Sequence, residues 1–297
     1  MRSTSQISER DAPFQLRGNN FTVMVLKLVA PDDPSFFPQL LSKIRQAPNF
    51  FKNAPVVLDL EELDESAGPA DHLKVFFPDP SNGILTLPEV GPDGIRRGAE
   101  GVVISRDYTP RAVRAELGRH PELDLDIVTH GVNGPASAWA EMAKVDDGLG
   151  IAGPRGSHLV PDGIERLIVV ADETALPATA RWLELLPADV AVTALFYVVG
   201  ESVESYFDAP AAARMDAEWV THFDGRQQLE ESLRSLGRID AGTFVFMAGE
   251  ADILVPLRRY LRHELLLPAE QVSASGYWRR GIVNLDHHAP LDPSDPD

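Results

Sequence analysis

The sequence contains no cysteine among its 297 residues. This absence excludes disulfide bonds, thiolate catalysis, iron–sulfur clusters and cysteine-ligated zinc. Any redox chemistry must therefore come from a bound organic cofactor or from a metal site without thiolates.

Cationic residues are also scarce: 27 Lys and Arg stand against 45 Asp and Glu, and the net charge is -18. Nucleic acids and anionic membranes attract proteins mainly through Lys and Arg, so neither is expected as a partner. The longest apolar run, residues 190–200, is too short to span a bilayer. Residues 1–14 are polar and do not resemble a signal peptide. We therefore expect a cytoplasmic protein without a membrane span.

The composition is otherwise that of a soluble globular protein, with 44% hydrophobic and 24% charged residues. After a polar arm at residues 1–17, β-branched runs predict strands at 21–28 and 54–60. Between them, apolar residues at helical spacing predict a helix at 34–46. Segment 18–63, and most specifically 43–60, resembles the beginning of the N-terminal domain of the septum-site-determining protein MinC. That resemblance implies a βαβ unit that could contact FtsZ, and an apparent chimera.

Residues 64–161 are expected to form a β-barrel, because short strands alternate there with Gly/Pro turns. Strands are predicted at 72–77, 101–109, 123–130 and 149–152, with a long loop at 84–100 and a short helix ending at 142. The pattern changes after Pro161. Apolar strands at 166–170, 191–199, 243–247 and 272–278 alternate with helices at 176–186, 227–236 and 252–266. This alternation predicts a parallel sheet covered by helices over 162–286, followed by a loose tail at 287–297.

Chemistry-bearing residues cluster at the ends of these strands. Arg106 and Tyr108 share one strand face, and Thr109 follows; Arg suits a phosphate and Tyr a flat heterocycle. Taken alone, these three residues favour an edge strand with a solvated Arg and a core Tyr over a ligand site. The helix start at Gly134–Ser137 and the segment 171–177 each offer backbone N–H groups to a phosphate. The alternative at 171–177 is a plain capping motif, with Thr174 as the N-cap and Pro177 in the first turn.

A barrel followed by an open parallel sheet is the layout of ferredoxin-reductase-like flavoproteins. Seven ordered blocks resemble the siderophore-interacting proteins of the ViuB type, which are FAD-dependent ferric-siderophore reductases. The blocks are His72–Pro78, Arg106–Arg111, Asp126–Gly131, Gly134–Trp139, Ala171–Pro177, Ala248–Ala251 and Gly276–Gly281. Ala171 departs from the glycine that is common in the family.

The resemblance implies electron transfer from NADPH or NADH through FAD to a ferric siderophore, without a metal site in the protein. Tyr108, Thr109 and Trp278 would lie at the reacting rings, and Lys74, Arg279 and Arg280 would bind the anionic substrate. The cofactor-binding set it implies is Arg106, Tyr108, Thr109, Thr129, His130, Gly134, Ala136, Ser137, Asp172, Glu173, Thr174, Gly249 and Glu250.

Two alternatives stay open from the sequence. The MinC-like segment replaces the expected first barrel strands, so the chain could be a cell-division module or an inactive fusion with a disrupted barrel. The sequence does not decide the siderophore, the preference between NADPH and NADH, or the oligomeric state.

Overall fold

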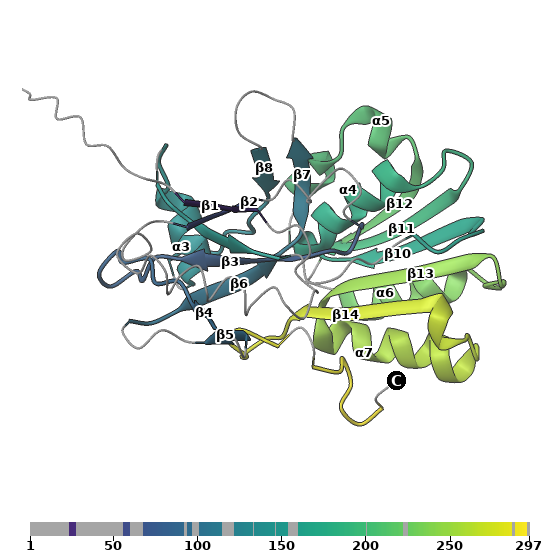
Figure 1. Ribbon diagram of the computed structural model, residues 1–297. Coiled ribbons are helices and arrows are strands. Elements are labelled where there is room, and N and C mark those ends of the chain that lie inside the picture. Colours follow the sequence, from purple (N-terminus) through teal and green to yellow (C-terminus); the bar gives the residue numbers. More distant parts are fainter. Residues whose placement is uncertain are drawn as a thin grey trace, which may run out of the picture. The chain divides into compact units, whose positions relative to one another are not determined.

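The computed structural model of the chain describes residues 24–27, 56–59, 68–91, 94–96, 101–114, 122–132, 134–145, 147–153, 160–199, 201–221, 225–286 and 289–295 (Figure 1). It divides into two units, 1–59 and 60–297. In the first unit, β1 (Met24–Lys27) pairs in parallel with β2 (Val56–Asp59). This pairing confirms the two strands of the expected βαβ unit. The arm at 1–17 and the helix expected at 34–46 lie outside the described residues.

The first part of the second unit is built from short antiparallel strands. A three-stranded sheet has the order β6-β3-β9, with β3 (Leu73–Phe77) between β6 (Ile104–Tyr108) and β9 (Gly150–Ala152). Two hairpins accompany it, β4 (Glu89–Gly91) with β5 (Gly94–Arg96), and β7 (Pro110–Arg114) with β8 (Glu122–Leu125). Helix α3 (Pro135–Met142) buries Ala136 against Val75 and Phe77.

Three details differ from the sequence prediction. Residues 101–103 precede β6, and Val102 is 61% exposed. Strand β8 ends at Leu125, five residues earlier than predicted. The expected loop at 84–100 contains the β4–β5 hairpin.

The second part of this unit is a five-stranded sheet in which all pairings are parallel, as predicted. Its order is β12-β11-β10-β13-β14. The strands are β10 (Arg166–Ala171), β11 (Ala191–Val198), β12 (Met215–Thr221), β13 (Thr243–Glu250) and β14 (Val272–Trp278).

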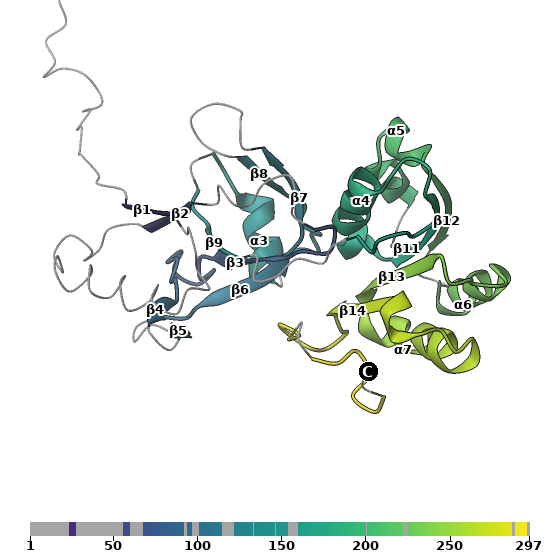
Figure 2. The same cartoon turned by 45° about the vertical axis from the view of Figure 1, so that its right-hand side comes forward.

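Helices cover both faces of this sheet (Figures 1 and 2). Leu167, Val169 and Ala171 of β10 pack with α4 (Leu176–Leu185). Ile168 and Val170, which point the other way, pack with α6 (Gly225–Ser235) and α7 (Ala251–Arg259). Burial on both faces explains the continuous apolar sequence of the central strands.

The sequence reading omitted β12. Its side chains alternate between more and less exposed, as expected of a strand at the edge of the sheet. Short helical segments join the strands: η1 (Glu173–Ala175), η2 (Glu201–Tyr206), α5 (Ala209–Ala212) and η4 (Ala269–Gln271). A π-helical turn, η3 (Tyr260–Glu264), continues α7.

The C-terminal segment is bound where a loose tail was expected. Leu291 is 9% exposed and packs in the core beneath α7. Arg258 forms an ion pair with Asp295 at 2.9 Å, and Arg259 forms another with Asp292. The acidic residues of this segment suggested a solvated tail, but two of them, Asp292 and Asp295, attach the segment to α7.

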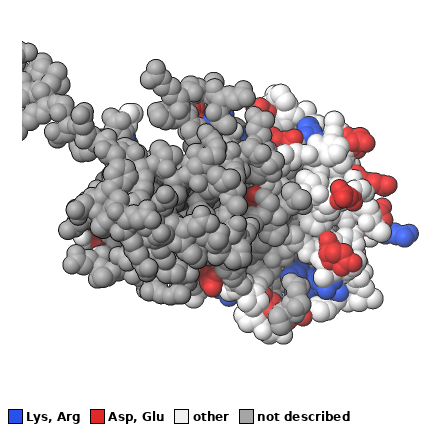
Figure 3. Space-filling view, viewed as in Figure 1, with Lys and Arg blue, Asp and Glu red and all other residues white. Residues whose placement is uncertain are grey.

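Acidic side chains gather on the parallel-sheet part of the described surface in Figure 3, where basic ones are fewer. Among the described residues, no helix is long and apolar enough to cross a membrane, and no group of His, Asp and Glu could hold a metal ion.

Candidate functional site

Strand β6 presents Arg106 and Tyr108 on one face, as the two-residue period requires. Arg106 Nη1 donates to Ser105 O at 2.7 Å and to Asn284 Oδ1 at 3.2 Å. The Tyr108 ring is half-buried and meets the Phe77 ring edge-on, with centroids 6.1 Å apart. Burial raises the pKa of Tyr108 to about 12, against the opposing effect of the Arg106 charge. Tyr108 therefore packs with the core of the antiparallel part, as the alternative reading of this motif expected.

Thr109 is only 6% exposed, and its hydroxyl lies close to the phenol of Tyr277. Burial raises the pKa of Tyr277 to about 12, and the Thr109 hydroxyl acts in the opposite direction. Tyr277 lies near the carboxyl end of β14. The contact brings the end of the antiparallel strand β6 beside the end of the parallel strand β14.

The loop before α3 contains the second group of predicted ligands. Thr129 and His130 are exposed, and the His130 ring lies over Gly134, where an added Cβ would stand 2.9 Å from His130 Cε1. Ser137 accepts a hydrogen bond from His130 N at 2.8 Å and donates to Gly131 O at 2.7 Å. The side chain of Ser137, which the sequence assigns to the cofactor, thus supports the loop, and Ala136 is buried.

The fully buried Asp172 carboxylate joins the ends of four parallel strands. Its Oδ1 accepts from the backbone N and hydroxyl of Thr174, at 2.8 and 2.5 Å. Its Oδ2 accepts from Trp278 Nε1 at 2.7 Å, Glu250 N at 2.9 Å and Tyr197 OH at 3.2 Å. Burial raises the pKa of Asp172, while the bonds from Thr174 and Trp278 lower it.

The other acidic residues of this edge are also engaged within the protein. Glu173 accepts a hydrogen bond from Val199 N, just after β11. Glu250 is 6% exposed; its Oε2 caps α7 by accepting from Ile253 N at 2.9 Å, and its Oε1 accepts from Arg280 N at 3.1 Å. The sequence places these carboxylates at the border of a nucleotide site, whereas they hold strand ends and helix starts together.

The alternative interpretation of 171–177 as a capping motif is correct, but the residue predicted as the N-cap is wrong. Asp172, not Thr174, is the N-cap of η1, and Ala175 precedes α4 without a side-chain cap. Pro177 lies in the first turn of α4, as expected. The Asp172 carboxyl oxygen accepts from both the backbone N–H and the hydroxyl of Thr174.

Gly249 makes this cluster possible. Its φ of +144° lies outside the range that L residues favour. An added Cβ would stand 2.6 Å from the Asp172 carboxylate and 2.8 Å from Tyr197 OH. The register of β13 against β14 also shifts here, so that Gly249 pairs with Gly276 and Glu250 with Trp278.

Of the three predicted substrate-binding cations, two are paired within the protein. Lys74 Nζ lies 2.7 Å from Asp107 Oδ1, opposite it in the β3–β6 ladder. Arg279 lies 3.1 Å from the Asp252 carboxylate and donates to Leu291 O at 2.9 Å. Arg280 is exposed. The cross-strand Asp107 was not visible as a partner of Lys74 in the sequence, because 33 residues separate them.

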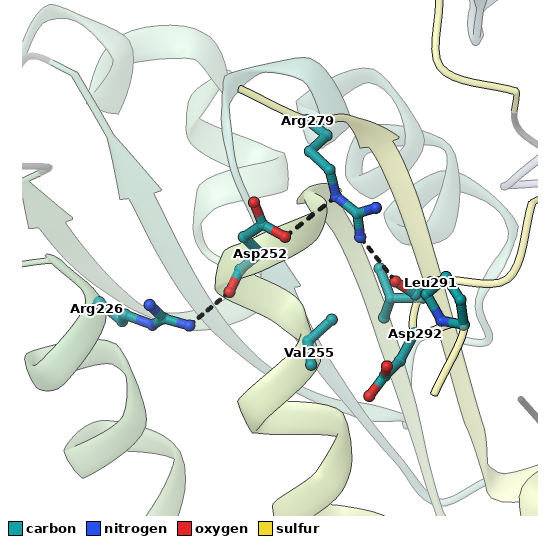
Figure 4. A pocket seen from close by; sticks show the side chains of 7 residues that line it. Arg226, Asp252, Val255, Arg279, Leu291 and Asp292 are labelled. Carbon is teal, nitrogen blue, oxygen red and sulfur yellow. Dashed lines mark hydrogen bonds and ion pairs between the residues drawn. The ribbon is translucent and has the colours of Figure 1, made fainter. Parts of the chain in front are cut away.

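A cavity of about 520 Å³ lies beside Arg279 (Figure 4). Arg226, at the start of α6, and Arg279 converge on Asp252: Arg226 binds its carbonyl oxygen and Arg279 its carboxylate. Leu291 and Asp292 of the bound C-terminal segment form another wall. The two cations face two carboxylates, so the cavity carries no net charge from these four side chains.

Sequence reasoning missed Tyr197, Tyr277 and Asn284. Tyr197 stands in a strand predicted as buried, and Tyr277 stands in the block Gly276–Gly281, where only its neighbours were assigned roles. A buried phenol needs a hydrogen-bond partner, and this requirement was the available signal. Asn284 reaches Arg106 across 178 residues and gave no local signal.

Two further contacts join the antiparallel and parallel parts of the second unit. Arg111 of β7 forms an ion pair with Glu184 of α4 at 2.7 Å. Tyr206 OH donates to the Asp126 carboxylate, and both burial and this bond raise the pKa of Tyr206.

Comparison with known proteins finds a family match for the antiparallel part and another for the parallel-sheet part. Residues 39–158 match the family described as "Siderophore-interacting FAD-binding domain", and residues 164–281 match "Siderophore-interacting protein". The first match begins inside the MinC-like segment 18–63, and the comparisons give no support to that second resemblance.

Individual relatives agree. The chain is 35% identical to an NADPH-dependent ferric-chelate reductase of Escherichia coli, over 75% of this chain and 85% of that protein. It is 29% identical to the ferric vibriobactin reductase ViuB of Vibrio cholerae, over 85% and 93%.

Among solved structures, a siderophore utilization protein from T. fusca has a TM-score of 0.67 at 39% identity, covering 75% of this chain and 85% of that one. SipS from Aeromonas hydrophila has a TM-score of 0.61 at 31% identity, covering 75% and 84%. The chain therefore belongs to the family of siderophore-interacting proteins.

Proposed function

We propose that this protein is a cytoplasmic flavoprotein that passes electrons from NADPH or NADH through FAD to a ferric siderophore. The observation that carries the proposal is the closeness of the Thr109 and Tyr277 hydroxyls, together with the Arg106–Asn284 hydrogen bond, because both set the end of β6 beside the end of β14. These are the strand ends at which a flavin and a nicotinamide would have to meet.

The residues of the antiparallel part fit FAD. Arg106 offers a guanidinium with donors beyond its two bonds, and the half-buried ring of Tyr108 offers an aromatic surface. Helix α3 begins at Gly134 without a side-chain cap, which suits its first N–H groups to a pyrophosphate. His130 beside Gly134 would border the same group.

Bound FAD supplies the conversion of one hydride from NADPH or NADH into two one-electron reductions of Fe(III), with release of a proton. Thr174, which is half-buried just beyond the end of β10, would border the dinucleotide. Trp278 would stand at the junction of the rings, and exposed Arg280 would attract the anionic ferric complex. Lys74 would join it only if its pair with Asp107 opened.

Absorption spectroscopy of the purified protein tests this function. We expect flavin bands, or their appearance when FAD is added, bleaching by NADPH or NADH without oxygen, and recovery on addition of ferric siderophore. Ferrous iron captured by a chromogenic chelator should reach two equivalents per NADPH consumed. A colourless protein that binds no FAD would contradict the proposal.

A second, independent hypothesis is that the MinC-like segment 18–63 contacts FtsZ. Parallel pairing of β1 with β2 is what a βαβ unit requires. Co-sedimentation with polymerised FtsZ tests it, and pelleting equal to that of a FtsZ-free control would remove it.

A further inference from the structure

Trp278 is held differently from the other three tryptophans. Trp182 lies between Phe244 and Phe246, Trp219 against Phe196, and Trp139 against Phe77, with ring centroids 4.3 to 5.9 Å apart. Among the described residues, no aromatic ring contact involves Trp278. Its indole N–H donates instead to Asp172 Oδ2 at 2.7 Å.

The backbone around Gly249 brings Trp278 and Asp172 within hydrogen-bond distance. The register shift between Gly249 and Glu250 places Trp278 opposite Glu250, whose own N–H donates to the same Asp172 oxygen. Gly249 leaves space for the carboxylate, which a side chain at that position would occupy. The register shift, the glycine and the buried acid therefore all contribute to the site at which Asp172 accepts from the half-buried ring.

Trp278 lies beside residues that approach strand β6. The preceding residue, Tyr277, lies close to Thr109 at the end of β6, and Asn284 further on accepts a hydrogen bond from Arg106 of the same strand. The indole thus stands where the nucleotide-binding edge meets the proposed flavin strand. A short N–H···O hydrogen bond to a fully buried carboxyl oxygen is directional, so it can fix the plane of the ring.

We propose that Asp172 is a positioning residue, which orients the Trp278 indole so that a nicotinamide can stack productively against the flavin. This proposal rests on the proposed function and deepens it. Asp172 touches neither cofactor in this account, since it is fully buried. Its loss should lower the rate of hydride transfer, because reactivity depends on ring geometry, and leave dinucleotide affinity nearly unchanged.

The test uses the full chain loaded with FAD and the variant Asp172→Asn. Asp71→Asn is the matched control, because Asp71 is also fully buried and lies outside this cluster. In ¹H–¹⁵N spectra, Trp278→Phe identifies the Trp278 indole resonance. We expect Asp172→Asn to move that resonance and to leave that of Trp182, whose indole N–H has no partner, in place.

Stopped-flow reduction by NADPH supplies the second readout. We expect Asp172→Asn to lower the limiting rate of flavin reduction roughly tenfold to a hundredfold. The half-saturating NADPH concentration should stay within about twofold, and Asp71→Asn should match the wild type. Trp278→Phe removes the same bond, so the double variant should be no slower than the slower single one.

The outcomes separate the two claims. A limiting rate for Asp172→Asn within twofold of the wild type, or an unmoved Trp278 resonance, overturns the positioning role. If Asp172→Asn does not fold, the rate of Trp278→Phe decides in the same way. If neither NADPH nor NADH reduces the flavin of the wild type, the proposed function fails, whereas the indole resonance still reports the bond.

Discussion

Substituting Gly249 by Ala should destabilise the parallel-sheet part far more than an ordinary glycine substitution. Two penalties act together at this position. The φ of +144° is unfavourable for alanine, and the new Cβ would lie 2.6 Å from a buried carboxylate and 2.8 Å from the Tyr197 hydroxyl. Neither group can withdraw easily, because Asp172 is held by five hydrogen bonds.

The magnitude follows from these two terms. A residue held in a sparsely populated backbone region costs about 1–3 kcal/mol. Overpacking of a filled site adds about 1–3 kcal/mol. We therefore expect a loss of about 2–6 kcal/mol in the free energy of unfolding. For a unit of this size, each kcal/mol lowers Tm by about 2–4 °C, so Tm should fall by roughly 4–24 °C.

Gly237→Ala is the control for strain without contact, because its φ is +71° and nothing lies within 4 Å of the added Cβ. That variant should lose about 1 kcal/mol. Thermal unfolding followed by circular dichroism compares the two, and near-ultraviolet spectra report the environment of Trp278. Equal stability of the two variants would refute the account of Gly249, since the crowding of Asp172 would then have no energetic effect.

Three further outcomes follow from the same contacts. Lys74→Met should cost less than about 1 kcal/mol in chemical denaturation, because the Lys74–Asp107 pair is partly exposed, and a cost above 2 kcal/mol would contradict this reading. Trp182→Phe should change stability by less than about 1 kcal/mol, because removing an unpartnered buried N–H offsets the small cavity; Trp219→Phe provides the comparison. The bonds from Ser294 and Arg259 lower the pKa of Asp292, and those from His263 and Arg258 lower that of Asp295. Docking of 289–295 should therefore be complete above the ordinary pKa near 3.8 and weaken as pH falls through the lower folded values; hydrogen exchange of this segment, corrected for intrinsic rates, should show no loss of protection between pH 7 and pH 5.

The sequence was sufficient where one residue pattern dominates. Strands β10, β11 and β13 are apolar on both faces, so their runs predict a buried parallel sheet without knowledge of their partners. Strand β12 escaped detection because it lies at an edge, where charged residues such as Asp216 and Glu218 interrupt the apolar pattern. Its neighbours, not its own composition, make it a strand.

The site shows the same division. Alternation along one strand predicts that Arg106 and Tyr108 share a face, because this needs only the period of two. Local motifs cannot reveal that Lys74 is neutralised by Asp107, that Thr109 meets Tyr277, or that Asp292 binds Arg259. Each of these pairs depends on the register or docking of segments more than 30 residues apart.

The acidic motif Asp172–Glu173 posed the main objection to a dinucleotide at this edge, because carboxylates repel phosphates. In the structure, however, both carboxylates accept hydrogen bonds from within the protein. Asp172 is directed into the protein and surrounded by N–H and O–H donors, and Glu173 accepts from the backbone after β11. These hydrogen bonds oppose the rise in the pKa of Asp172 that burial causes, without reversing it. Both carboxylates are thus bound within the protein, where they join strand ends, and the Asp172 side chain is not exposed at this edge.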